Sequence, residues 1–216
     1  MKYKMLIAAL FLASGLQGEE TLLFQDDFRD GNLKDNTVWK SKSASSPWQV
    51  TASRATATGK IAFDSLSTSD FKAIANGAFD LRFTIVFASD AKTGDNRFSV
   101  YLRDSANGNN GYGATIAQGT SNNSGLEKID SGKTTMLCQL PPAKAFYFSP
   151  DKATEIRLRR EPSGLLELSI DGNPVLKATD SAFSRFDCLQ FTLRCKNPEM
   201  IQSIGAVSLS NSSNIK

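Results

Sequence analysis

The sequence contains no histidine. This absence excludes Ser-His-Asp and Cys-His nucleophile systems, and it excludes zinc, iron and copper sites that histidine ligates. The three cysteines form no CxxC pair, so we expect no cysteine-only zinc site either. Composition therefore predicts neither a metal of these kinds nor a cofactor.

The three cysteines are also too few for a disulfide framework. Cys188 and Cys195 lie seven positions apart in one predicted strand, so their side chains point to opposite faces and cannot join. Cys138 would pair with either of them, or all three are small buried apolar residues. In both cases the hydrophobic core has to supply most of the stability.

Long apolar runs are missing beyond the first residues. Lys2 and Lys4 precede the apolar run Met5–Ala13, and small and polar residues follow it. This is the pattern of a secretory signal peptide, and the run is too short to span a bilayer. We expect residues 1–18 to be removed on export, which would place residues 19–216 in the periplasm or outside the cell, with no membrane span.

The expected mature chain carries little net charge. Lys2 and Lys4 are the only charged side chains of the signal peptide, so their removal lowers the formal net charge from +3 to +1. A nearly neutral chain gives no electrostatic reason to expect nucleic acid or an acidic membrane as a partner.

The mature sequence is rich in alternating apolar and polar side chains. The clearest examples are Phe79–Ala88, Arg97–Arg103 and Thr154–Cys195, and no segment shows sustained helical periodicity. Antiparallel sheets with one solvated face need this alternation. It predicts an all-β fold, a two-sheet antiparallel β-sandwich of the jelly-roll type, in a single domain over residues 19–216.

Local patterns add detail to that fold. We expect Thr154–Cys195 to be an antiparallel meander, with Asp171-Gly172 as a two-residue type I′ turn. The first and last strands, Thr21–Phe28 and Ser203–Ser210, are expected to lie side by side. The Gly- and Asn-rich segment Asn107–Gly113 is expected to be a loop.

Several stretches resemble a known family. They are LFQDDFRDGNLKDNTVWK, PWQV, FDLRFTIVF followed by RFSVYLRDS, and LLELSIDGNPV. Together they resemble secreted bacterial jelly rolls of the concanavalin A-like lectin/glucanase superfamily, including laminin-G-like and 3-keto-disaccharide hydrolase-type domains. The resemblance implies two curved sheets whose concave face or rim loops bind glycans. It implies no particular reaction, because the superfamily includes lectins, glycosidases, lyases and spacers.

The catalytic motifs of that superfamily are absent from the sequence. The Glu-x-Asp-x-x-Glu string of its glucanases does not occur, and the Gln-x-His motif of its alginate lyases lacks the histidine. We therefore assign no catalytic residue and expect non-catalytic binding of a polysaccharide or cell-surface glycan. The alternatives are a glycoside hydrolase with carboxylates supplied by loops, and a structural module of the cell envelope without a small ligand.

Candidate sugar-binding side chains lie on the outward faces of predicted strands and at one tryptophan. Arginine offers planar donors to carboxylated or hydroxyl-rich glycans, and an indole ring offers a flat face to a pyranose. Burial in the core is the favoured interpretation for Trp39 and Trp48, and dispersal over both sheets is favoured for the outward residues. The candidate carbohydrate-binding residues are Arg82, Tyr101, Arg103, Trp48, Gln190 and Arg194.

One oxygen-rich stretch has the ligand type of a calcium site. It contains Asp26, Asp27, Asp30 and Asn32, in a spacing that does not fit an EF-hand loop. Asx turns explain these residues adequately, and we assign no metal to them.

Overall fold

The computed structural model describes residues 20–34, 38–43, 47–57, 61–87, 97–107, 109–117, 119, 124–141, 144–149, 151–195 and 202–212. The predicted signal peptide, residues 1–18, lies outside these ranges. Every regular element within them is a β-strand, and they contain no helix long and apolar enough to cross a membrane.

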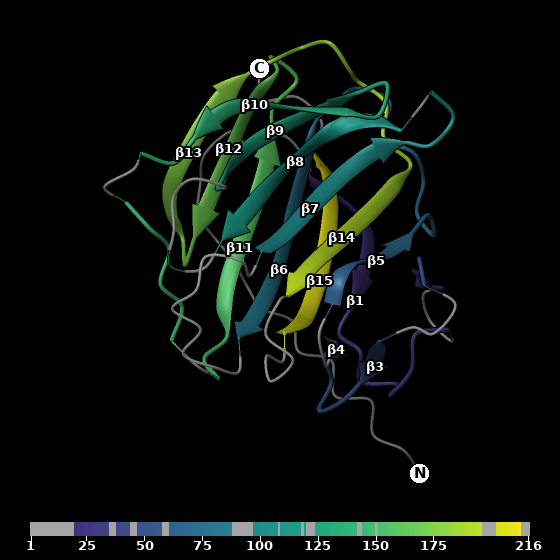
Figure 1. Cartoon of the computed structure of the whole chain (residues 1–216). Coiled ribbons are helices and arrows are strands. Elements are labelled where there is room, and N and C mark those ends of the chain that lie inside the picture. The colour runs from purple at the N-terminus through teal and green to yellow at the C-terminus, as the bar shows by residue number, and fades with distance from the viewer. Residues whose placement is uncertain are drawn as a thin grey trace, which may run out of the picture.

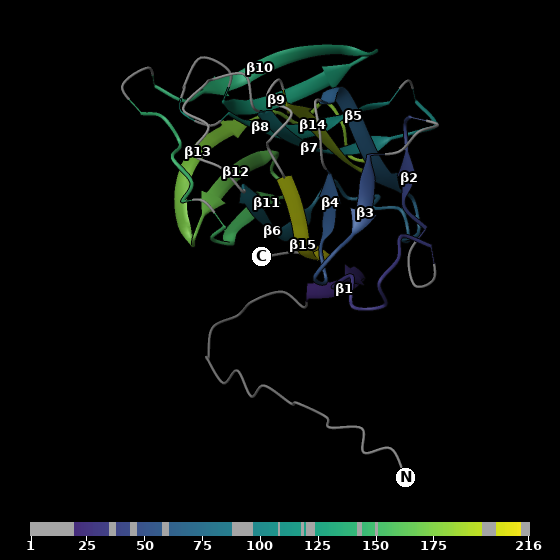
Figure 2. The same cartoon turned by 60° about the horizontal axis from the view of Figure 1, so that its bottom comes forward.

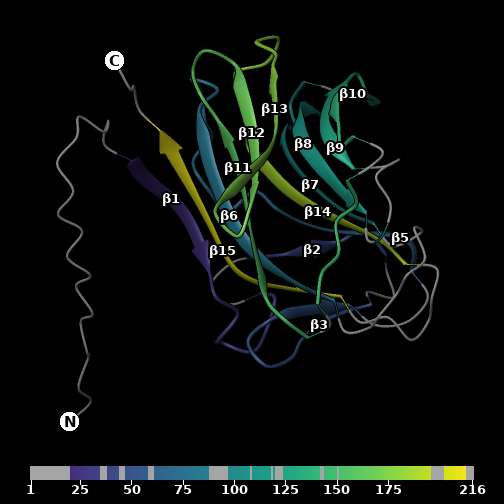
Figure 3. The ribbon, with the colours of Figure 1, turned by 90° about the vertical axis from the view of Figure 1, so that its left-hand side faces the viewer.

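The strands form two antiparallel sheets that pack face to face (Figure 1 and Figure 3). Sheet A contains, in spatial order, β13 (Asn173–Thr179), β12 (Leu165–Ile170), β11 (Thr154–Arg160), β6 (Phe79–Phe87), β15 (Gln202–Ser212), β4 (Ala55–Ala57) and β3 (Trp48–Val50), and β1 (Glu20–Asp26) also pairs with β15. Sheet B contains β10 (Lys133–Gln139), β9 (Gly125–Asp130), β8 (Asn110–Ala117), β7 (Arg97–Asp104), β14 (Cys188–Cys195), β5 (Ile61–Thr68) and β2 (Lys40–Ser41).

The core lies between the sheets and is rich in aromatic rings. Phe83 of β6 lies 5.5 Å from Phe98 of β7 and 5.1 Å from Phe191 of β14, measured between ring centroids. Trp39 joins them at 5.8 Å from Phe191. All four side chains are almost fully buried. Because burying one such side chain contributes about 1.5–3 kcal/mol, this cluster holds the two sheets together.

The expected pairing of the first and last strands is confirmed. β1 runs antiparallel to β15, with Glu20 opposite Ser212 and Asp26 opposite Val207 (Figure 2). The turn Asp171-Gly172 is also as predicted, since φ is 47° and 76° at its two residues and a type I′ turn needs both positive.

The predicted meander is correct for three strands and wrong for the fourth. β11, β12 and β13 follow one another in sheet A, but β14 crosses to sheet B and lies between β7 and β5. Alternation indicates that one face of a strand is buried, and it does not say in which sheet the strand lies. The segment between Thr179 and Cys188 provides the crossing.

The prediction of a loop over Asn107–Gly113 is wrong in its second half. Residues from Asn110 onward form β8, which pairs with β7 on one side and β9 on the other. Gly111 and Gly113 therefore lie inside a central strand. Glycine in that position often marks a place where another group approaches the backbone closely.

The oxygen-rich stretch adopts Asx turns. Asp26 Oδ1 accepts the backbone N–H of Phe28 at 2.7 Å, and Asp26 Oδ2 accepts the indole N–H of Trp39 at the same distance. Asp30 Oδ1 accepts the backbone N–H of Asn32 at 3.2 Å. These contacts support the Asx interpretation of the sequence.

Cys138 and Cys188 are free thiols. This excludes a disulfide between them, which was one of the two pairings considered. The side chain of Cys195 lies outside the described part of the structure.

Candidate functional site

The outer face of sheet B carries a polar groove of about 320 Å³, which we call the sheet-B groove. Its lining comes from strands across the whole sheet and from the segment after β2. The lining residues are Lys42, Ser65, Tyr101, Arg103, Ile129, Thr134, Gln190 and Thr192.

Glycine residues of β8 form the floor beside Tyr101. In the sheet register, Tyr101 of β7 lies opposite Gly113, and Gly113 lies opposite Glu127 of β9. A Cβ atom on Gly113 would lie 2.3 Å from the Tyr101 ring and 2.1 Å from the carbonyl oxygen of Val100. The missing side chain therefore allows the Tyr101 ring to lie across β8 and reach β9.

A network of hydroxyl groups fixes Tyr101. Its hydroxyl donates to Glu127 Oε2 at 2.5 Å, and the Thr115 hydroxyl donates to the same oxygen at 2.9 Å. The Ser99 and Thr115 hydroxyl oxygens lie 2.8 Å apart. Burial and the charge of Glu127 raise the pKa of Tyr101, so the phenol stays neutral and remains a donor. The groove thus has a rigid, pre-organised centre.

Arg103 and Gln190 lie next to this centre. Arg103 Nη1 donates to Gln190 Oε1 at 2.6 Å, and the guanidinium carbon lies 5.7 Å from the centroid of the Tyr101 ring. Burial lowers the pKa of Arg103, but an arginine in a protein remains charged. The pair offers donors and acceptors to a ligand and carries a positive charge.

Three of the six predicted site residues meet in the sheet-B groove: Tyr101, Arg103 and Gln190. Arg194 is on the same face of β14, two residues beyond Thr192, and does not line the groove.

The other two candidates lie away from this groove. Trp48 is 4% exposed and belongs to the core, so its ring cannot stack on a sugar, and the favoured interpretation of the sequence was the right one. Arg82 is on the outer face of sheet A, where it donates to Asp80. Period-two alternation identifies outward side chains, but it does not assign them to a sheet.

Several groove residues were missed in the sequence. Thr115 of β8 and Glu127 of β9 were not among the candidates, because one sequence does not show that these two strands lie beside β7. The alternation of Gly111 and Gly113 with Tyr112, which is fully buried, is the signal that could have shown β8 to be a strand.

The groove has few acids. None of its lining residues is Asp or Glu, and Glu127 beneath Tyr101 is held by two hydroxyl donors. Within the described ranges, no cluster of three or more His, Cys, Asp or Glu side chains could hold a metal ion. Glycoside hydrolysis with two carboxylates needs a second acid opposite the first, and the lining does not provide one.

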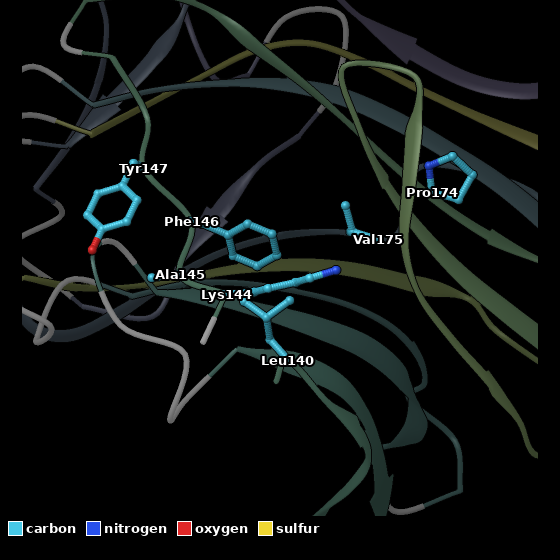
Figure 4. A pocket seen from close by; sticks show the side chains of 7 residues that line it. All are labelled: Leu140, Lys144, Ala145, Phe146, Tyr147, Pro174 and Val175. Carbon is cyan, nitrogen blue, oxygen red and sulfur yellow. The ribbon is translucent and has the colours of Figure 1, made fainter. Parts of the chain in front are cut away.

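A second hollow, which we call the rim hollow, has a volume of about 410 Å³ and lies where β10 and β13 approach each other. In Figure 4 the Phe146 ring and Val175 lie beside each other near the alkyl chain of Lys144, while Tyr147 points away from them. Tyr147 is 75% exposed. The lining residues are Leu140, Lys144, Ala145, Phe146, Tyr147, Pro174 and Val175. This hollow is mainly apolar and offers fewer hydrogen-bonding side chains than the sheet-B groove.

No protein-family model matches the sequence, and no curated protein matches it. Solved structures of similar fold do exist. The carbohydrate recognition domain of Emp47p has a TM-score of 0.67 at 13% identity, over 93% of this chain and 100% of that one. The exoplasmic/lumenal domain of VIP36 in its Ca²⁺/Man3GlcNAc-bound form gives 0.65 at 11% identity, over 91% and 92%.

A third similar structure is the carbohydrate binding module CBM66 from Bacillus subtilis. It has a TM-score of 0.59 at 14% identity and covers 81% of this chain and 96% of that one. At such low identity these structures show the fold. They confirm the predicted all-β, two-sheet antiparallel jelly-roll sandwich, of the kind found in lectin domains.

Proposed function

We propose that this protein is an exported, non-catalytic carbohydrate-binding domain and that the sheet-B groove holds the sugar. The observation that carries the proposal is the pre-organised polar lining around Tyr101, Arg103 and Gln190. Sugar hydroxyls both donate and accept hydrogen bonds, and amide, hydroxyl and guanidinium groups on a rigid sheet complement them. Fixed side chains also reduce the entropy lost on binding.

Three structures of similar fold are described as carbohydrate-binding or carbohydrate-bound, which supports this proposal. Two are a carbohydrate recognition domain and a carbohydrate binding module, and a third was solved with Man3GlcNAc bound. Export is supported by the charged, apolar and small-residue pattern of residues 1–18. We infer that the mature chain acts in the periplasm or outside the cell. Mass spectrometry of the protein from separated culture medium, periplasmic and cytoplasmic fractions would give its N-terminus and its compartment.

The test is a glycan array probed with the mature protein and two variants. Gln190→Ala with Thr192→Val removes an amide and a hydroxyl from the groove, and Arg82→Gln changes an outward residue of sheet A. We expect the wild type and Arg82→Gln to bind the same glycans and the groove variant to lose them. Absence of binding by the wild type, or unchanged binding by the groove variant, would contradict the proposal.

The same samples test the hydrolase alternative. A bound oligosaccharide incubated with the protein should stay intact, because the groove lining contains no carboxylate pair. New reducing ends in the wild-type sample would show an enzyme.

A further inference from the structure

The charge of Arg103 lacks an acidic partner among the described residues. Its guanidinium donates to the neutral amide oxygen of Gln190 and lies over the Tyr101 ring. Its Nε is buried and has no hydrogen-bond partner in the described part of the chain. A partly buried charge is costly unless an opposite charge neutralises it.

Two other arginines, Arg157 and Arg185, are neutralised by carboxylates of the chain. Arg157 donates two hydrogen bonds to the carboxylate of Asp80 at 2.9 and 3.0 Å through its Nε. Arg185 lies 2.8 Å from a carboxylate oxygen of Asp187. Arg103 differs from both because its side-chain partner is uncharged.

The titratable neighbours Cys188, Tyr101 and Glu127 do not supply the missing charge. Cys188 lies opposite Arg103 in the sheet, and burial raises the pKa of its thiol, so it stays protonated. The phenol of Tyr101 is neutral for the same reason. The Oε2 atom of Glu127 already accepts hydrogen bonds from Tyr101 and Thr115.

Two basic side chains and no acidic one are in the lining of the groove. Lys42 and Arg103 are both in the lining, and Glu127 beneath it is one carboxylate. A cleft of one sign concentrates ligands of the opposite sign. An anionic group on the ligand would both neutralise Arg103 and match this field.

We propose that the sheet-B groove binds an acidic saccharide, whose carboxylate or sulfate group pairs with Arg103. This inference rests on the proposed carbohydrate-binding function and specifies its ligand class. The guanidinium plane matches the geometry of such oxyanions, and a hydrogen bond between two charged groups is about twice as strong as one between neutral groups.

The experiment compares pairs of polymers that share a sugar backbone and differ in whether that backbone carries acidic groups. Isothermal titration calorimetry would measure polygalacturonate against its fully methyl-esterified form, and dextran sulfate against dextran. We expect an acidic member to bind about ten- to hundredfold more tightly than its neutral partner, as one charged hydrogen bond provides. Preference confined to the first pair assigns a carboxylate ligand, and preference confined to the second assigns a sulfate.

Two variants connect the preference to one side chain. Arg103→Gln should lose the ten- to hundredfold advantage, while Arg103→Lys should keep part of it because the positive charge is retained. Arg82→Gln is the matched control on sheet A and should bind like the wild type. Unchanged melting temperatures would show that all three variants are folded.

The outcomes separate this inference from the function on which it rests. Equal binding of acidic and neutral polymers, unchanged preference in Arg103→Gln, or no binding of any of the four polymers would overturn the acidic ligand. If the glycan array still gave groove-dependent binding, the carbohydrate-binding function would stand. An array without any signal would overturn both.

Discussion

The outer faces of the two sheets share a sequence pattern and differ in chemistry. On sheet A, Asp80 is 2% exposed and accepts hydrogen bonds from Arg82 and Arg157. On sheet B, Tyr101 and Arg103 line an open groove. Their hydrogen-bond partners are Glu127 and Gln190, and the groove above them stays open to a ligand. Opposite charges thus neutralise one another on sheet A, while sheet B keeps polar groups available to a ligand.

The register explains this difference. Arg82 lies directly opposite Arg157 between β6 and β11, and this pair of like charges would be unfavourable without Asp80 beside it. In sheet B the corresponding row runs from Tyr101 through Gly113 to Glu127. On sheet A long side chains fill the row, whereas on sheet B the glycine leaves space that the Tyr101 ring occupies as it reaches Glu127.

The largest expected effect comes from adding a side chain where the Tyr101 ring lies. In Gly113→Ala the new Cβ would lie 2.1 Å from the Val100 carbonyl oxygen, so the strand or the Tyr101 ring has to move. We expect a loss of about 3 kcal/mol in the free energy of unfolding, together with loss of glycan binding. Urea denaturation and calorimetry would measure both.

Gly172→Ala is the control for that substitution. Gly172 has a φ of +76°, and a Cβ added there would meet nothing within 4 Å. The substitution should therefore cost about 1 kcal/mol through backbone strain alone and leave binding intact. Equal losses at both glycines would show that the floor of the groove is not tightly packed.

Asp80→Asn should have the next largest effect, on sheet A. Burial opposes the charge of Asp80, but hydrogen bonds from Arg157 and Arg82 outweigh it and lower the pKa of the carboxyl group. Loss of the charge leaves two arginines opposite each other, and both are partly exposed. We therefore expect a cost of about 2 kcal/mol at pH 7, below that of a fully buried pair. Glycan binding should not change.

The lowered pKa of Asp80 also determines how its contribution to the free energy of unfolding depends on pH. The contribution of the Asp80 carboxylate is fully present above about pH 4, the ordinary range of an aspartate, and is lost as the pH falls through the lowered value. The stability difference between wild type and Asp80→Asn should therefore shrink at acidic pH. Urea denaturation at neutral pH and near pH 2 would measure it, and a constant difference would contradict this role of Asp80.

Much of the fold could be predicted because strands are local. Alternation identified Phe79–Phe87 and Leu165–Ile170, and turn chemistry identified Asp171-Gly172. The position of β14 could not be predicted, since its pairing with β7 and β5 depends on distant parts of the chain. Neither could the first half of β8, because its glycines are as typical of a turn as of a strand.

The site was partly predictable because the outward side chains of a strand follow from its local alternation. Outward alternation selected Tyr101, Arg103 and Gln190, which the register of β7 and β14 brings together. The same rule selected Arg82, whose strand belongs to the other sheet. Glu127 was missed because its importance depends on a hydrogen bond across β8. Contacts of this kind require the order of strands, which one sequence does not contain.

Tyr101→Phe tests whether the centre of the groove is pre-organised. It removes the donor to Glu127, a residue that is 8% exposed and that keeps the Thr115 hydroxyl as a donor. We expect a loss of about 1–2 kcal/mol in the free energy of unfolding. In a double-mutant cycle with Glu127→Leu, whose side chain cannot accept a hydrogen bond, the two effects should be less than additive, since both remove the same contact. Additive effects would show that the contact is not maintained in solution.

The smallest effect is expected at Arg82, and it tests the comparison most directly. The Arg82 side chain is 46% exposed, and Asp80 keeps Arg157 as a partner when Arg82 is replaced. Arg82→Gln should therefore change the free energy of unfolding by less than about 1 kcal/mol, as exposed ion pairs do. Arg103→Gln makes the same chemical change on sheet B and should weaken binding of an acidic glycan. If Arg82→Gln weakened binding instead, the glycan would lie on sheet A, and the ion pairs there would be part of its site.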